Sequence, residues 1–168
     1  MNDIRKHTVA CIANNRTGVL ARLAGSFAGK GINISSLSVG DMEEGTTRMT
    51  VVVKCGTDAL AEVVALLRAL PDIVQVEDLD KADVIERQLM LVRVRAEGED
   101  IARIMQLVEV FRATVAGMGR RSLTIEMAGP ESRVDALANL LRPFGILEMA
   151  RTGRVALDHD EHDEASPR

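Results

Sequence analysis

A pattern of short apolar segments occurs twice along the 168-residue chain and constrains its fold more than any other feature. In the first half, strand-like segments at residues 7–13, 32–39, 48–54 and 73–79 alternate with helix-like segments at residues 19–30 and after Thr57. A β-α-β-β-α-β unit folds as a four-stranded antiparallel sheet with both helices on one face, because its crossovers are right-handed. We therefore predict an α+β fold of two ferredoxin-like domains.

The helix expected at residues 19–30 has the clearest signals. Its apolar residues recur at the spacing of one helix face, namely Leu20, Leu23, Ala24, Phe27 and Ala28. Gly29 and Gly31 predict its end. In the following strand the apolar residues change parity between Ile34 and Leu37, which indicates a bulge.

Breaks in the apolar pattern mark the second helix and the domain boundaries. Thr57 and Asp58 are expected to cap that helix, and Pro71 ends it. The breaks predict four parts: a first domain at residues 1–80, a polar linker at 81–84, a second domain at 85–158 and an acidic, disordered tail at 159–168.

The second half repeats the order of elements with little identity to the first. Its expected elements are strands at residues 86–95, 115–118, 123–127, 145–151 and 154–157, and helices at 101–111 and 132–141. Each unit leaves one sheet face uncovered, and its edge strands carry unpaired backbone groups. Burial of a face or an edge against a second copy makes a homodimer a physical expectation.

The charge of the chain argues against two classes of partner. Its net charge is −4, and residues 158–168 account for all of it, with five carboxylates and one arginine. The neutral remainder gives no long-range attraction to nucleic acid or anionic lipid. No apolar run approaches the roughly 18 residues of a membrane span, and no signal or transit peptide is recognisable, so we expect a cytoplasmic protein.

The sequence offers no recognisable catalytic or metal site. Cys11 and Cys55 lie in apolar, strand-like segments, where a buried free thiol behaves as a small apolar residue. The cysteines and histidines have no metal-ligand spacing, and no nucleophile elbow or Walker-type phosphate loop is present. Residues 117–121, Gly-Met-Gly-Arg-Arg, would suit a phosphate, but two glycines at a hairpin are more often turn residues. We therefore expect a non-catalytic protein.

The candidate binding site is the segment at residues 13–23, together with residues 31–34, Gly-Ile-Asn-Ile. A helix N-terminus offers unpaired N–H groups and partial positive charge, which suit a carboxylate. Gly18 permits close approach of the main chain, and Asn15 and Asn33 each supply a donor and an acceptor. These groups match a zwitterion, so a small amino acid is the expected ligand, although the same residues also fit an ordinary turn.

Nearly the whole chain, to about residue 158, also resembles one family. It resembles the ACT domain of acetolactate (acetohydroxyacid) synthase small subunits in Asn-Arg-Thr-Gly-Val-Leu-Ala-Arg at residues 15–22, in Phe27 and in residues 31–37 and 48–50. The resemblance continues through residues 85–93, 109–112 and 148–153, in a second half specific to that family. The usual motif has glutamate before the asparagine and often proline before the glycine, whereas this chain has Asn14 and Thr17.

The resemblance implies a regulatory subunit that activates a thiamine-diphosphate-dependent catalytic subunit and confers feedback inhibition by valine in branched-chain amino acid biosynthesis. It implies thiamine diphosphate, Mg²⁺ and FAD on the catalytic subunit and no cofactor in this chain. It also implies a homodimer that binds valine at its interface, with two sets of residues: Asn15, Gly18, Val19 and Leu20 on one side, and Asn33 and Ile34 on the other.

Two alternative functions fit the same order of elements. An ACT-type amino-acid sensor for another enzyme would differ only in its partner. An RNA-binding β-α-β-β-α-β module stacks bases on exposed aromatic residues of its strands. The aromatic residues here are Phe27, Phe111 and Phe144, all at helical or loop positions, so RNA is the weaker alternative.

Overall fold

A computed structural model describes residues 4–80 and 83–159, which form two compact units. The first unit takes in the described residues up to Ile85 and those from Arg154 onward, and the second is Glu86–Gly153. The disordered tail expected at 159–168 lies, except for His159, outside the described residues, as do residues 81–82 of the expected linker. Within the described part of the chain, no helix is long and apolar enough to cross a membrane.

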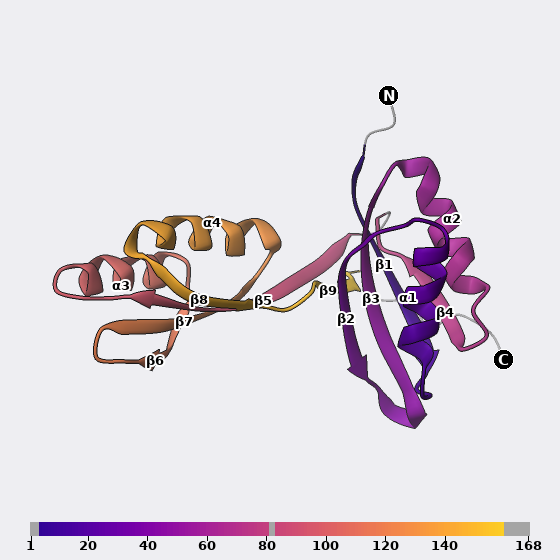
Figure 1. The fold of residues 1–168 in the computed structure, drawn as a ribbon, viewed down its shortest axis with the longest axis horizontal. Coiled ribbons are helices and arrows are strands. Elements are labelled where there is room, and N and C mark those ends of the chain that lie inside the picture. Colours follow the sequence, from indigo (N-terminus) through magenta and orange to yellow (C-terminus); the bar gives the residue numbers. More distant parts are fainter. Residues whose placement is uncertain (1–3, 81–82, 160–168) are drawn as a thin grey trace. The chain divides into compact units, whose positions relative to one another are not determined.

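The first unit has the predicted order of strands and helices. Its elements are β1 (Arg5–Asn14), α1 (Val19–Gly29), β2 (Ile34–Asp41), β3 (Thr46–Cys55), α2 (Thr57–Arg68), β4 (Ile73–Asp78) and, at the other end of the chain, β9 (Val155–Asp158), with a 3-10 turn at Glu43–Gly45. The strands pair antiparallel in the order β2-β3-β1-β4, and α1 and α2 cover one face of the sheet (Figure 1). The bulge predicted in β2 is confirmed, because its register shifts between Ile34 and Ser36.

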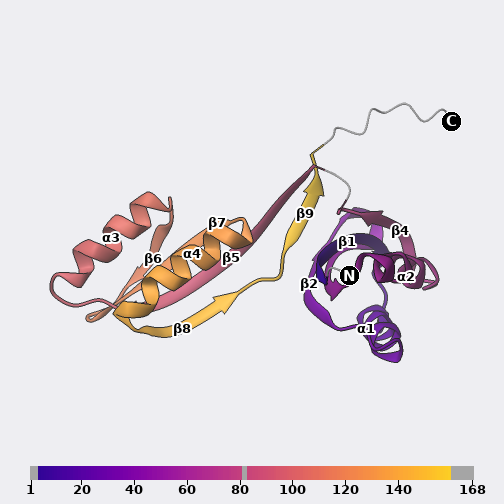
Figure 2. The same ribbon diagram turned by 90° about the horizontal axis from the view of Figure 1, so that it is seen from above.

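The second unit repeats this arrangement. Its elements are β5 (Val84–Arg95), α3 (Asp100–Val110), β6 (Thr114–Met118), β7 (Ser122–Gly129), α4 (Glu131–Leu141), a 3-10 turn at Arg142–Phe144 and β8 (Ile146–Arg151). The sheet has the order β6-β7-β5-β8, with β9 paired to β5 as its fifth strand. Figure 2 shows α3 and α4 on the same side of it. The α+β class and the two β-α-β-β-α-β units are therefore confirmed.

Helix ends agree with the sequence at α1 and differ at α2. After α1, Gly31 has a φ of 67°, its N–H donates to the Ala28 carbonyl, and the Ile32 N–H donates to the Phe27 carbonyl, a Schellman ending. α2 begins at Thr57, so Gly56 occupies the N-cap and the predicted cap is wrong by one position. The residue after a strand must still be extended, which Gly56 is, before the helix can start.

The buried stripe of α1 is narrower than predicted. Val19, Leu23 and Phe27 are buried against the sheet, at a spacing of four residues. Leu20, with a 42% exposed side chain, and Ala24 and Ala28 lie on the exposed flank. The apolar periodicity predicted the helix correctly, but the predicted buried face also included the positions that follow Val19, Leu23 and Phe27, which are exposed.

The face of the first sheet away from the helices is covered at its centre, which corrects the prediction of an open face. The C-terminal segment, Arg154–Asp158, places Ala156 against Ala10 and Leu79. Two hydrogen bonds of Arg154 hold this segment in place. Its backbone N–H donates to Ser36 Oγ at 3.1 Å, and its side-chain Nη1 donates to Thr8 Oγ1 at 2.9 Å. The strand expected at residues 154–157 is present as β9, which pairs with β5, and its Ala156 also packs on the first unit.

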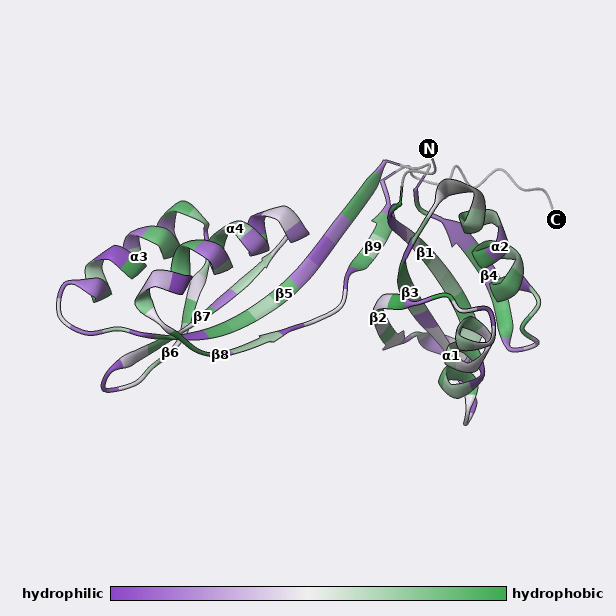
Figure 3. Cartoon of the chain, turned by 45° about the horizontal axis from the view of Figure 1, so that its top comes forward, coloured by the Kyte–Doolittle hydropathy of each residue, from purple (hydrophilic) through white to green (hydrophobic). Residues whose placement is uncertain are grey.

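Hydropathy along the strands reflects this difference in covering. Figure 3 shows alternating hydrophilic and hydrophobic bands along β5, whereas β1 and β3 are more continuously hydrophobic. In β3 the residues from Met49 to Val53 are all buried.

The free thiol of Cys11 is also buried, and burial raises its pKa to about 11, against an opposing effect of the Arg48 charge. Cys55 is only partly buried.

Candidate functional site

The N-terminus of α1 is open to an anion. Gly18 precedes the helix with a φ of 86°, and no side chain caps the helix. The first turn of α1 has no acidic residue, whereas α3 and α4 have Asp100 and Glu131 in theirs. The partial positive charge at this helix end is therefore not offset by a carboxylate of its own first turn.

The left-handed backbone at Gly18 favours glycine for two reasons. A positive φ is strained for any residue with a Cβ. A Cβ built at Gly18 would also lie 3.2 Å from Nη1 of Arg22. Glycine thus keeps the main chain of the loop accessible where the helix begins.

Asn15 ties the loop before α1 to the turn between β2 and β3. Its N–H donates to the Gly45 carbonyl at 2.8 Å, and its Nδ2 donates to Oδ1 of Asp41 at 3.1 Å. Both Asn15 and Asp41 are exposed. The sequence prediction missed Asp41. Only the pairing of β1 and β2 with β3 shows that the last residues of β1 and β2 lie at the same end of the sheet.

An ion pair behind the loop fixes its position. Arg22 donates to Oδ2 of Asp72 from Nε at 2.7 Å and from Nη2 at 2.6 Å, and Asp72 is buried. The Asp72 carbonyl accepts the N–H of Asn14 at 2.8 Å. Sequence reasoning missed this pair as well, because Arg22 reads as a solvent-facing residue and Asp72 as part of a helix break.

The two remaining predicted residues of the loop differ in exposure. The Val19 side chain is buried in the core, so Val19 can offer only its main chain to a ligand. Leu20 is partly exposed beside the loop. Of the residues predicted on this side, the structure brings together Asn15, Gly18 and Leu20, and it adds Asp41.

Asn33 and Ile34 lie at the other end of the same sheet. Asn14 pairs with Thr46 of β3, whereas Ile34 pairs with Val53. Seven residues of β3 separate these levels, which corresponds to about 23 Å of strand. Asn33 is exposed and Ile34 packs partly against the core. A single chain therefore does not bring the two predicted halves together.

The rival sites have a simpler structural role. Residues 119–122 form the turn between β6 and β7, in which the Gly119 N–H donates to the Ser122 carbonyl at 2.8 Å. Phe27 is buried, and Phe111 and Phe144 pack against the second core, so no aromatic residue lies on a strand to stack a base. Over residues 4–80 and 83–159, no three acidic, histidine or cysteine side chains form a group that could hold a metal.

Comparison with known families accounts for both units. Residues 9–75 match the family model of the AHAS small subunit-like ACT domain, and residues 87–160 match the model of the small subunit of acetolactate synthase. Among curated proteins, the chain is 41% identical to the probable acetolactate synthase small subunit of Archaeoglobus fulgidus, over 90% of this chain and 96% of that one.

Two further relatives define the extent of the likeness. The chain is 41% identical to the chloroplastic acetolactate synthase small subunit 2 of Arabidopsis thaliana, over 98% of this chain but only 34% of that longer protein. The crystal structure of the acetolactate synthase small subunit from Thermotoga maritima superimposes with a TM-score of 0.86 and 35% identity, covering 94% of this chain and 99% of that one.

Proposed function

Because the chain belongs to the family of acetolactate synthase small subunits, we propose that it binds valine between two copies of its first unit and thereby inhibits a catalytic subunit that it otherwise activates. The catalytic subunit carries thiamine diphosphate, Mg²⁺ and FAD, and this chain carries no cofactor. The complex works in the cytoplasm, in branched-chain amino acid biosynthesis.

The unprotected edge of β2 is the observation that supports the homodimer. Residues 34–40 of this edge strand carry no charge and no proline, and Val39 is 45% exposed. Edge strands that must stay unpaired usually carry charges, proline or a shortened length. The first unit thus presents an edge suited to pairing with the same edge of a second copy.

Antiparallel pairing of two β2 edges would unite the two predicted halves of the site. A twofold axis through the middle of β2 sets the Ile34 end of one strand beside the Asp41 end of the other. In each copy Asp41 is bonded to Asn15, next to the N-terminus of α1. Asn33 of one copy would then face the loop before α1 of the other copy, whereas the loop of its own copy lies at the opposite end of the sheet.

The groups at such a junction match the parts of valine. The N-terminus of α1 suits the carboxylate, the oxygens of Asp41 and Asn33 suit the ammonium group, and Leu20 and Ile34 offer apolar surface. Sensing between millimolar and micromolar requires about 4 to 8 kcal/mol. A helix end gives about 0.3 to 1 kcal/mol, so several charge-assisted bonds of about 1.5 to 3 kcal/mol each must contribute.

Regulation follows if valine binds one arrangement of the dimer more tightly than another. A ligand shifts an equilibrium only by its difference in affinity for the two states. A site built from two copies has this property, because any change in the angle between the β2 edges alters the distance between its halves.

Calorimetry of the chain with valine, leucine and isoleucine tests the site, and inhibition of the reconstituted enzyme tests the regulation. Asn33→Ala should weaken valine binding at least about tenfold by removing a charge-assisted bond, while the fold is retained because Asn33 is exposed. Gly18→Asp is a less clean variant, since the positive φ adds strain.

Asn139→Ala, an exposed asparagine of α4, is the matched control and should bind valine as the parent does. Unchanged valine affinity in Asn33→Ala would show that the site is wrongly placed. Valine binding without association to an acetolactate synthase catalytic subunit would instead assign the chain to another enzyme.

A further inference from the structure

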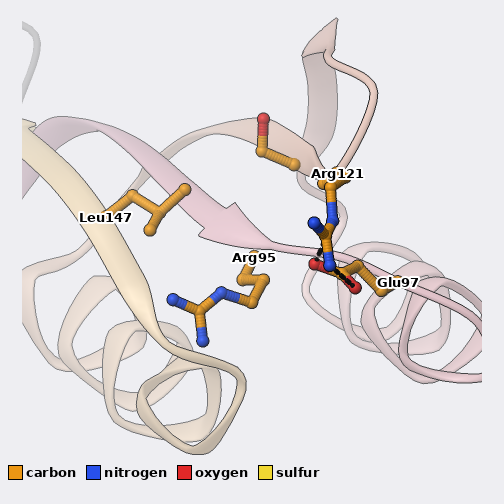
Figure 4. Close-up of a pocket in the computed structure, with 5 residues that line it drawn as sticks. Arg95, Glu97, Arg121 and Leu147 are labelled. Atoms are coloured by element: carbon orange, nitrogen blue, oxygen red, sulfur yellow. Dashed lines mark hydrogen bonds and ion pairs between the residues drawn. The ribbon is translucent and has the colours of Figure 1, made fainter.

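A cavity of about 540 Å³ lies at one end of the second sheet (Figure 4). Three segments form it: Arg95 and Glu97 at the end of β5, Arg121 and Ser122 at the start of β7, and Leu147 in β8. We refer to these five residues as the arginine pocket. Figure 4 shows Arg95 between Leu147 and the pair of Arg121 and Glu97.

The arginine pocket has one uncompensated positive charge. Glu97 accepts two hydrogen bonds from Arg121, from Nε at 2.7 Å and from Nη2 at 2.6 Å, so these two charges offset each other. This bidentate pair lowers the pKa of the Glu97 carboxyl. The guanidinium of Arg95 makes no hydrogen bond or ion pair with any residue that the structure describes.

The backbone holds the arginine pocket in one shape. Arg95 lies in the ladder between Ser122 of β7 and the Gly145 carbonyl, which accepts its N–H at 2.9 Å. The register of β8 on β5 shifts between Arg93 and Val94, which leaves Leu147 outside the regular pairing with a 51% exposed side chain. Bulges of this kind often re-aim a side chain at a functional site.

Arg95 acts on Glu97 only through the attraction of its charge and makes no hydrogen bond or ion pair among the described residues. Such an arginine beside the exposed Leu147 has the composition of an interface anchor. Arginine is enriched at the energetic centres of protein interfaces, where its planar fork binds carboxylates in a fixed geometry. The remaining charge of one matches a carboxylate, whereas a phosphate carries about −1.5 to −2. A free carboxylate would also lose more entropy on binding than so few contacts offset.

We propose that the arginine pocket receives a single aspartate or glutamate side chain of the catalytic subunit, with Leu147 packing against the apolar residues beside it. The inference rests on the proposed function, since it takes the catalytic subunit as the partner. It assigns to the second unit a contact with that subunit that is separate from the valine site.

The test measures association of the full chain with the cognate catalytic subunit. Arg95→Glu should raise the dissociation constant at least about tenfold, because it sets a carboxylate against a carboxylate. Arg95→Lys should have a smaller effect, since it keeps the charge and loses the fork. Arg103→Glu makes the same charge change on α3, where Arg103 is exposed, and should leave association unchanged.

Rising ionic strength should weaken the parent complex and have little further effect on Arg95→Ala. Valine binding by Arg95→Glu should equal that of the parent. Association of Arg95→Glu as tight as the parent's would overturn the inference and leave the proposed function intact. No association of the parent chain at all would overturn both.

Two other occupants have their own readouts. Binding of acetate or inorganic phosphate to the isolated parent chain, lost in Arg95→Glu, would make the arginine pocket a small-anion site and overturn the inference. Weaker self-association of Arg95→Glu in sedimentation would make the occupant a second copy, with the same consequence.

Discussion

The two units share an order of elements but differ in how their sheets are buried. In β1 and β3, runs of consecutive residues are buried on both faces, whereas in β5 and β7 buried and exposed residues alternate. Ala156 of the C-terminal segment and Val84 at the start of β5 pack with Ala10 and Leu79 and so cover part of the second face of the first sheet. The shared topology thus fixes which face the helices cover, and other parts of the chain decide what becomes of the opposite face.

A second difference concerns the free ends and edges. In the first unit, the first turn of α1 has no acidic residue, and residues 34–40 of the edge strand β2 carry no charge. In the second unit, both helices have an acidic residue in the first turn. Its edge strand β8 carries Glu148 and Arg151, whereas its other edge strand, β6, is uncharged. The features that support the proposed ligand site and the proposed dimer edge therefore lie in the first unit, at α1 and β2.

The largest difference between the two units should be the loss of stability when a charged residue is placed on the sheet face away from the helices. Ala10→Glu places a carboxylate where Ala10 is 0% exposed under the C-terminal segment, and should lower the free energy of unfolding by about 3 kcal/mol. Leu91→Glu, on the corresponding face of β5 and 40% exposed, should cost less than about 1 kcal/mol. Urea unfolding followed by circular dichroism, with amide exchange to separate the units, makes the comparison.

Equal losses from Ala10→Glu and Leu91→Glu would show that the C-terminal segment does not protect the first sheet. The chain has no Trp or Tyr, so intrinsic tryptophan fluorescence cannot replace these methods.

Charge on the two edge strands should have a smaller effect, on assembly alone. Val39→Lys in β2 should raise the dimer dissociation constant about tenfold, or about 1.4 kcal/mol, because lysines repel and protect an edge. Met149→Lys in β8, where Met149 is 36% exposed, is the control and should leave the dimer unchanged. Sedimentation equilibrium measures both, and a dimer that tolerates Val39→Lys is not formed through β2.

The smallest effect is a titration in the second unit. Hydrogen bonds from Arg121 lower the pKa of Glu97 from its ordinary value of 4.5, so the stabilising contribution of this pair is present above pH 4.5 and is lost as pH falls through the lowered pKa. Carboxyl carbon NMR should give a midpoint below 4.5, and Arg121→Ala should raise it. If Glu97 has the same titration midpoint in Arg121→Ala as in the parent, the pair of Arg121 and Glu97 does not form in solution.

Almost the whole fold could be predicted from the sequence, because the patterns that indicate it lie in neighbouring residues. Apolar periodicity, the glycines after α1 and the change of parity in β2 each concern neighbouring residues, and each has a counterpart in the structure. The same reasoning found the C-terminal strand, which pairs with β5, but not its packing on the first sheet. Its packing on Ala10 joins residues about as far apart as the chain allows, and no local pattern encodes such a contact.

The candidate site was predictable only in part, for the same reason. Gly18 and the uncapped start of α1 could be found from the sequence, because they belong to one loop. Asp41 and the pair of Arg22 with Asp72 depend on strand register and tertiary packing. In the proposed dimer, Asn33 reaches the loop of the other copy, a relation that spacing within one chain cannot reveal.

The position of the C-terminal segment also affects how the chain can fold during synthesis. A domain at the start of a chain commonly folds while the ribosome still makes the rest, at about 5 to 20 residues per second. Here Ala156, which completes the burial of Ala10, emerges after the entire second unit. The first unit to be made is therefore the last to be finished, and a nascent chain released before residue 154 leaves an apolar sheet face for chaperones to cover.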